Sequence, residues 1–193
     1  MPPFCFEPHT GVRMVFILSN DGRYEDSPNG VKKAFERYRD YLEQNEATFP
    51  PRAYQLATSD WFYYPNDRRC PHDAWLVSFQ MTEMPVRKAL KPCSISIRLL
   101  GAFHDGHIEM IYPRVFSYSL QCSMAENVTT HGDWWYDEFR LSERGHLIHE
   151  IEWAPQAQGK PFSWIIEADD VDFRWIPLKA EQDLSPNPSS LGR

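Results

Sequence analysis

The sequence predicts an α+β protein that is mainly β: a meandering antiparallel sheet, curled or folded into two layers, with one N-terminal amphipathic helix packed on it. Three observations support this prediction. Apolar residues follow helical spacing in one stretch before residue 50, they alternate as in strands after residue 74, and turn signals divide that alternation into hairpins.

The helix is predicted to begin at Pro28, because Ser27 is a good capping residue and proline is favoured in a first helical turn. Apolar residues follow at the i, i+3, i+4, i+7 spacing of one helical face, while the other face is charged. The apolar positions are Val31, Ala34, Phe35, Tyr38, Tyr41 and Leu42. Before this helix, residues 14–18 predict a short buried strand; after it, residues 52–73 predict irregular structure with one short helix.

The first predicted hairpin turns at Asp105–Gly106, a pair typical of type I′ turns. With that turn, Phe103 faces Ile108 and Gly101 faces Met110. Apolar partners then share one face, and the missing side chain of Gly101 leaves room for Met110.

The second predicted hairpin has a three-residue loop, residues 143–145, with a glycine in the left-handed position. The third joins residues 162–166 to residues 171–175 across an acidic turn. The pairs expected in the second hairpin are Leu141 with Leu147, Phe139 with His149, Asp137 with Ile151, and Trp135 with Trp153. Cross-strand aromatic and branched pairs stabilise a sheet by about 0.2–1 kcal/mol each.

The chain is long enough and apolar enough to bury one core, since 42% of its 193 residues are hydrophobic and 15% are aromatic. We expect a single globular domain over residues 1–178. The polar, proline-containing residues 179–193 are expected to form a frayed tail.

The net charge of −7 disfavours a nucleic-acid partner, because phosphate contact needs a clustered basic surface. No apolar run approaches the roughly 20 residues that cross a membrane, and the first residues lack the features of a secretory signal. A cytoplasmic location is therefore expected. The four cysteines lie far apart, and glycine-rich phosphate loops are absent from the sequence, so we expect free thiols, no metal and no cofactor.

The histidines offer the main candidates for chemistry. His104 and His107 bracket the first turn, where a third metal ligand is hard to gather, so an exposed pair is favoured over a metal site. His146 and His149 point to opposite faces of a strand and cannot chelate one ion. His149 is expected to face the core beside Asp137. Such a pair could act as a general base, but a buried histidine satisfied by one carboxylate is favoured, and binding is favoured over catalysis.

Acidic and aromatic residues are predicted to share the outward face of the second hairpin. Clustered charge speeds encounter with a basic partner, and exposed Trp and Tyr supply binding hot spots. The alternative is a solvated acidic face without a partner. The candidate partner-binding residues are Trp134, Tyr136, Glu138, Glu150 and Glu152, together with Asp169, Asp170 and Asp172 around the third turn.

Residues 95–106 and 136–142 resemble hairpins of small bacterial β-rich proteins, some of which are immunity partners of polymorphic toxins. The resemblance covers residues 74–177 and carries over no catalytic or binding residue. It implies a non-enzymatic protein that neutralises a toxin by covering its active site, and the acidic face would suit a basic toxin. The alternative hypothesis is an enzyme or small-ligand binder with an aromatic-lined cavity that contains His149 and Asp137.

Overall fold

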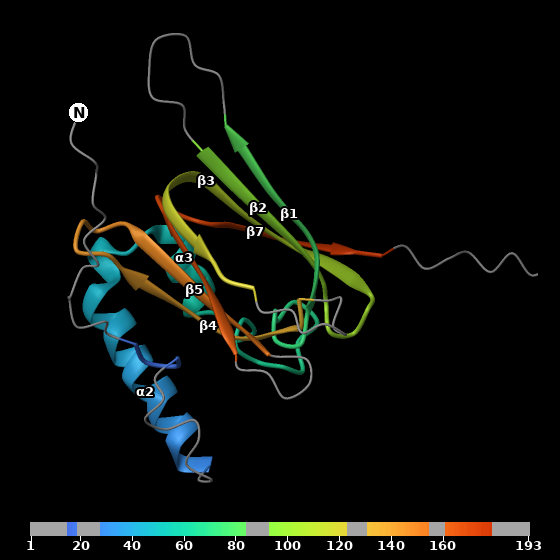
Figure 1. The fold of residues 1–193 in the computed structure, drawn as a ribbon. Helices are drawn as coiled ribbons and strands as arrows, with labels where there is room; N and C mark the ends of the chain where they lie inside the picture. The colour runs from blue at the N-terminus through green and yellow to red at the C-terminus, as the bar shows by residue number, and fades with distance from the viewer. Residues whose placement is uncertain (1–14, 19–27, 84–92, 123–130, 155–160, 179–193) are drawn as a thin grey trace, which may run out of the picture.

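Helices and strands follow the predicted class. The structure, a computed structural model, describes residues 15–18, 28–83, 93–122, 131–154 and 161–178 (Figure 1). The helices are α2 (Pro28–Asn45), the 3-10 turn η1 (Glu46–Thr48) and α3 (Pro51–Ala57). The strands are β1 (Trp75–Glu83), β2 (Cys93–Leu100), β3 (Gly106–Leu120), β4 (Asp133–Leu141), β5 (Leu147–Ala154), β6 (Phe162–Ala168) and β7 (Asp172–Pro177). The fold is therefore α+β and mainly β, as predicted.

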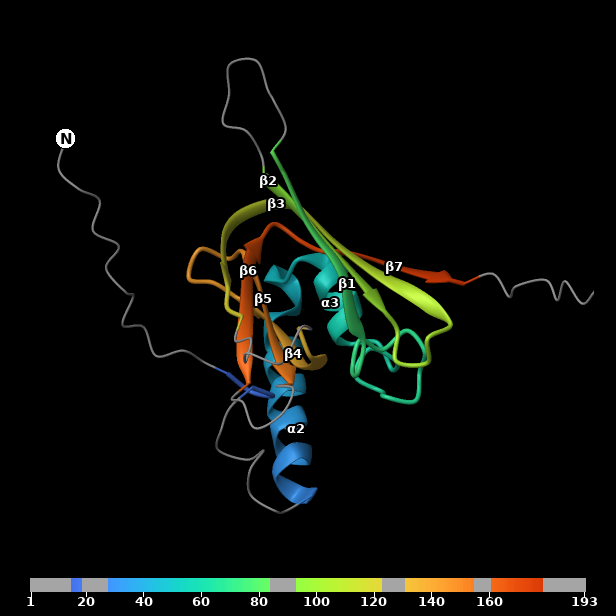
Figure 2. The ribbon, with the colours of Figure 1, turned by 45° about the vertical axis from the view of Figure 1, so that its right-hand side comes forward.

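The strands form one antiparallel sheet that curls into two layers. Pairing runs from β1 through β2, β3, β6 and β5 to β4, and β7 extends the ladder along β3. In Figure 2, β1, β2 and β7 lie in one layer, β4, β5 and β6 lie in the other, and α3 sits between them. Within the described ranges β1 and β4 share a single residue pair, Trp75 with Asp133. Just before β1, the Asp73 N–H donates to the Trp134 carbonyl (2.8 Å) and the Trp134 N–H donates to the Ala74 carbonyl (2.9 Å), so the ends of the curl meet over a short stretch.

Strand β3 is long because it serves both layers. Its first half pairs with β7 and its second half with β6. Between them the Asp169 N–H donates to the Arg114 carbonyl (2.9 Å), so residues 162–177 run beside β3 as one bent strand. The predicted third hairpin is wrong: residues 162–166 and 171–175 do not pair with each other. Two alternating apolar segments joined by acidic residues look the same in sequence whether the chain turns back or bends onward.

The first hairpin keeps the predicted faces but not the predicted register. The Gly101 N–H donates to the Gly106 carbonyl (3.0 Å), and Ile108 pairs with Leu99 where Phe103 was expected. A four-residue loop therefore replaces the two-residue turn. Because the register differs by an even number of residues, the apolar side chains stay on the same face.

Trp175 of β7 explains this register. A Cβ atom on Gly106 would lie 2.2 Å from the Trp175 ring, and one on Gly101 would lie 3.0 Å from it. The space that the two glycines leave is therefore filled by Trp175, not by Met110. This contact joins residues about 70 positions apart, which turn propensity does not describe.

The second hairpin is confirmed over most of its length, and Gly145 adopts the expected left-handed conformation (φ 77°). A bulge at Trp135 changes its far end, so that Trp153 pairs with Trp134 and not with Trp135. The bulge turns Trp134 into the core. The confirmed pairs are Leu141 with Leu147, Phe139 with His149, and Asp137 with Ile151.

Aliphatic and aromatic side chains from facing strands fill the space between the layers. Helix α2 packs its predicted apolar face, with Ala34, Tyr38 and Leu42 buried, while Val31 stays 36% exposed. The fully buried strand residues include Ile95, Ile97 and Leu99 of β2, Ile108, Met110 and Tyr112 of β3, Leu147, Ile151 and Trp153 of β5, and Ile166 of β6.

The edge of β4 that faces away from β5 is covered by tyrosine hydroxyls of α2. The Tyr38 hydroxyl accepts the N–H of Phe139 (2.8 Å) and donates to its carbonyl (3.0 Å). The Tyr41 hydroxyl accepts the N–H of Leu141 (2.8 Å). Bare strand edges are templates for pairing with other chains, so these hydroxyls replace a neighbouring strand.

Residues 15–18 form a turn over the outer face of β4, and the strand predicted for them is wrong. The N–H groups of residues 16–18 all donate to one carboxylate oxygen of Glu138, at 3.0, 2.7 and 3.2 Å. Burial raises the pKa of Glu138, against the lowering effects of Arg140, 3.0 Å away, and of the three N–H groups. The turn therefore supplies donors that a buried carboxylate requires.

Other predictions concern segment boundaries. Helix α2 begins at Pro28 as predicted, and α3 is the short helix expected near residues 52–73. The Ser27 cap and the tail over residues 179–193 lie outside the described residues. None of the helices that the structure describes is long and apolar enough to cross a membrane.

Replacing Tyr38 with Phe should destabilise the protein by about 1–3 kcal/mol, because the buried N–H and C=O of Phe139 would lose their partner. Urea unfolding followed by tryptophan fluorescence measures this change. Tyr118→Phe is the matched control, since Tyr118 is 47% exposed, and it should change stability by less than about 0.5 kcal/mol. Equal effects of the two changes would show that the α2 tyrosines do not support the β4 edge.

Candidate functional site

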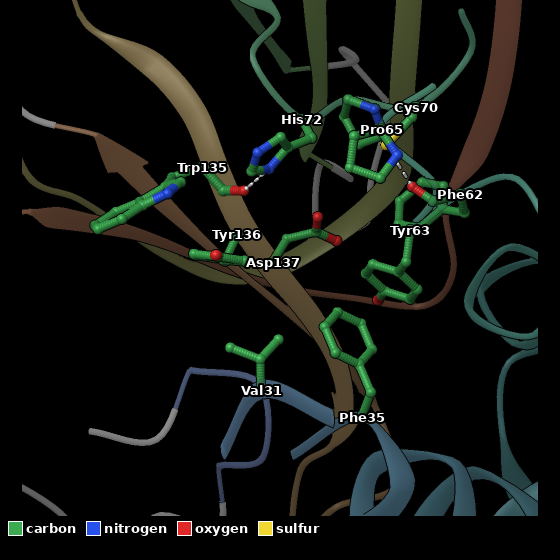
Figure 3. Close-up of a pocket in the computed structure, with 11 residues that line it drawn as sticks. Val31, Phe35, Phe62, Tyr63, Pro65, Cys70, His72, Trp135, Tyr136 and Asp137 are labelled. Carbon is green, nitrogen blue, oxygen red and sulfur yellow. Dashed lines mark hydrogen bonds between the residues drawn. The ribbon is translucent and has the colours of Figure 1, made fainter. Parts of the chain in front are cut away.

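A pocket of about 270 Å³ lies along the edge of β4 (Figure 3). One wall comes from α2, a second from residues 62–72, and a third from residues 135–137 of β4. His72 covers one end of this stretch, with Nδ1 2.5 Å from the Trp135 carbonyl. Tyr38 covers the other end. The pocket therefore lies where the chain before β1 stops pairing with the β4 backbone and helical and loop side chains cover the edge instead.

The lining is mostly aromatic. The rings of Phe35 and Tyr63 lie 5.5 Å apart at 68°, so the walls of α2 and of residues 62–72 meet edge to face. Within the second wall, the rings of Phe62 and Tyr63 lie 4.9 Å apart at 88°. Figure 3 shows the Asp137 carboxylate directed into the space between these side chains. The lining residues are Val31, Phe35, Phe62, Tyr63, Pro65, Cys70, Pro71, His72, Trp135, Tyr136 and Asp137.

Asp137 is held from behind by two N–H donors. The Trp134 indole Nε1–H donates to Oδ1 (3.0 Å), and His149 Nε2 lies 3.0 Å from Oδ2. The Tyr112 hydroxyl lies 2.5 Å from His149 Nδ1. Burial raises the pKa of Tyr112 well above its ordinary value, so its phenol donates to Nδ1 and leaves the imidazole proton on Nε2, facing Asp137. Each carboxylate oxygen thus accepts one buried N–H.

Burial keeps the proton on two other groups of the pocket, Cys70 and Tyr63. Burial raises the pKa of the Cys70 thiol to about 12, and the charge of Asp137 adds to this effect. The Cys70 thiol donates to the Phe62 carbonyl (3.0 Å). Burial likewise raises the pKa of Tyr63 well above its ordinary value. A protonated thiol is a weak nucleophile, so this lining favours recognition over covalent chemistry.

The predicted pair of His149 and Asp137 is brought together, but the two residues do not share a cavity. His149 is fully buried, and its ring centroid lies 4.1 Å from that of Phe139. Only Asp137 reaches the pocket. The interior of the curl is filled around the imidazole, which matches the favoured interpretation of a histidine satisfied by one carboxylate.

The acidic face of the second hairpin was predicted to be exposed, and this prediction is wrong. Glu138 is 0% exposed, Glu150 1% and Glu152 9%. Trp134 is fully buried on the opposite, inner face because of the bulge at Trp135, while Tyr136 is partly buried and lines the pocket. Strand alternation identified the two faces but could not show that the acidic one would be covered.

The acidic residues near the β6–β7 bend help to position α3. Asp170 accepts the N–H groups of Arg52 (3.2 Å) and Ala53 (2.9 Å), where the partial positive charge of a helix N-terminus favours a carboxylate. Asp172 pairs with the Arg52 guanidinium (2.7 Å). Asp169 is exposed, 3.7 Å from Arg114. Of the three, Asp169 is exposed, while Asp170 and Asp172 are half-buried.

Sequence reasoning missed the second wall of the pocket, residues 62–72. The stretch has no periodic pattern, because its chain makes successive turns rather than a regular element. Its run of aromatic residues, Trp61 to Tyr64, was the available signal. Aromatic residues gathered in an irregular segment have to be buried against another element or to line a cavity.

The histidines of the first hairpin do not form the expected exposed pair, because His107 is half-buried. His107 pairs with Leu100, while His104 is exposed in the loop, 4.4 Å from the Trp75 ring. Across the described ranges there is no group of three or more His, Cys, Asp or Glu side chains that could hold a metal ion.

Replacing Asp137 with Ala should lower the free energy of unfolding by about 3 kcal/mol, since each buried N–H left without a partner costs about 1–3 kcal/mol. Chemical denaturation measures the difference. Asp169→Ala, at an exposed carboxylate, is the control and should stay within about 0.5 kcal/mol of wild type. If the two variants were equally stable, Asp137 would not organise the Trp134 and His149 donors.

Comparisons with protein-family models, curated proteins and solved structures found no match to this chain.

Proposed function

We propose that the protein binds a small organic molecule in the pocket along the β4 edge. The observation that carries this proposal is the position of Asp137: a carboxylate fixed by two N–H donors at the base of an aromatic-lined cavity. Ligand sites commonly combine apolar walls with a few oriented polar groups. The volume of about 270 Å³ is near the lower end of such sites and suits a ligand the size of one ring.

Binding is favoured over catalysis by the chemistry of the lining. The Cys70 thiol is protonated, and the Tyr112–His149 chain approaches Asp137 from the side away from the pocket. The imidazole that could act as a base is thus separated from any ligand by the carboxylate that it holds. The hydrogen-bond network acts as support for a recognition group.

Filling the pocket mouth tests this proposal. Val31→Trp places a large ring at a half-exposed position of α2 that lines the pocket, and Lys32→Trp places the same ring on the solvated face one residue later. Single-ring organic fragments should bind wild type and Lys32→Trp alike and bind Val31→Trp at least tenfold more weakly, as read by saturation-transfer NMR. If no fragment bound the two variants with different affinity, the pocket would be excluded as a ligand site.

A second candidate function is protein binding through β1. This candidate keeps the expected non-enzymatic binding role, including neutralisation of a toxin, but it does not use the buried acidic face. Three apolar side chains of this strand are unusually exposed: Trp75 at 49%, Val77 at 52% and Met81 at 44%. Exposed Trp residues are frequent hot spots of protein interfaces.

Charge substitution on β1 tests the second candidate. A stoichiometric partner recovered by affinity purification and mass spectrometry should be lost with Val77→Lys and kept with Ser78→Lys, a neighbouring exposed position. Circular dichroism would verify that both variants fold. Recovery of the same partner with both variants would exclude this strand as its binding surface.

A further inference from the structure

We infer that the pocket binds a small organic cation, an amine whose ammonium group pairs with Asp137 and whose apolar body lies against the aromatic walls. The inference rests on the proposed function and adds the charge and chemical class of the ligand. Four observations support it: the charge of the lining, the electrostatic effect of that charge on neighbouring groups, the spare acceptor capacity of the carboxylate, and the walls.

The lining carries a carboxylate and, among the residues that the structure describes there, no lysine or arginine. The nearby Arg140 belongs to the opposite face of β4. It lies 3.0 Å from Glu138 there and also forms an ion pair with Glu150. Its charge is therefore directed away from the pocket, and Asp137 sets the sign of the potential inside.

Neighbouring groups respond to that potential. After the larger effect of burial, the charge of Asp137 raises the pKa of Cys70 and Tyr63 in the lining and of Tyr112 behind it. Cys70 and Tyr63 belong to the wall of residues 62–72 and Tyr112 belongs to β3, so the negative charge of Asp137 acts on groups on both sides of it. An anionic ligand would be repelled, and a neutral one would leave the charge of a buried carboxylate uncompensated.

Asp137 keeps acceptor sites for an ammonium group. A carboxylate offers about four lone-pair positions, and Trp134 and His149 occupy one on each oxygen. Both donors approach from the core, which fixes the carboxylate without closing its pocket side. The side chain is therefore preorganised, so little rotamer freedom remains to be lost when a cation binds.

The aromatic walls suit the same class of ligand. Ring faces carry negative quadrupole potential and attract a cation that lies within about 6 Å of the ring centre. The rings of Phe62 and Tyr63, which line the pocket, lie 4.9 Å apart and nearly perpendicular to each other. An alkyl or benzyl ammonium ion can pack its apolar part on these rings while its charge reaches Asp137.

Three probes of nearly equal shape test the inference on the full chain: benzylamine, benzyl alcohol and benzoate, each titrated by calorimetry at neutral pH. Benzylamine should bind wild type at least tenfold more tightly than benzyl alcohol, and benzoate should bind more weakly than either. In Asp137→Asn the advantage of the amine should disappear while benzyl alcohol still binds, which shows that the pocket persists.

The comparison in wild type does not depend on whether Asp137→Asn folds. Benzyl alcohol or benzoate binding as tightly as benzylamine would overturn the cation assignment and leave the proposed function standing, provided that Val31→Trp weakens that binding. Absence of binding by all three probes, or equal binding to Val31→Trp and Lys32→Trp, would overturn the ligand site itself.

Discussion

The backbone edge of β4 is the constraint on which the rest of this structure depends. The sheet curls until β1 meets β4, but among the described residues these strands share one pair, and the remaining edge groups of β4 need other partners in a dry environment. Tyr38 and Tyr41 satisfy part of the edge, and His72 bonds to another part. Helix α2 and the turns after α3 are thus fixed in place by the incomplete closure of the sheet.

The same strand buries two carboxylates on opposite faces, and each has its own set of donors. Glu138 faces outward and is held by backbone N–H groups of residues 16–18, while Asp137 faces inward and is held by Trp134 and His149. A buried carboxylate without partners would be strongly destabilising, so both sets of donors are structural requirements. The two carboxylates differ in one respect, because Asp137 also lines a cavity.

This combination explains why a ligand site arises at this position in the fold. A fully closed sheet would pair the β4 edge with another strand and leave no room beside it. An edge covered only at its ends leaves a space bounded by side chains that are already ordered by the core, and rigid surroundings favour specific binding. The buried Tyr112–His149 chain contributes by fixing the carboxylate, not by entering the cavity.

The sequence by itself determined the features that depend on local periodicity: the class of fold, the face of α2, the second hairpin with Gly145, and the burial of His149 beside Asp137. These follow from spacing along one segment or across one short loop. Only the tertiary structure decided the register imposed by Trp175, the bend that replaced the third hairpin, and the burial of Glu138. Each depends on contacts between residues far apart in the chain, and alternation assigns a side chain to a face without indicating what covers that face. The pocket belongs to this second group, because its walls come from three distant segments that meet only where β1 and β4 separate.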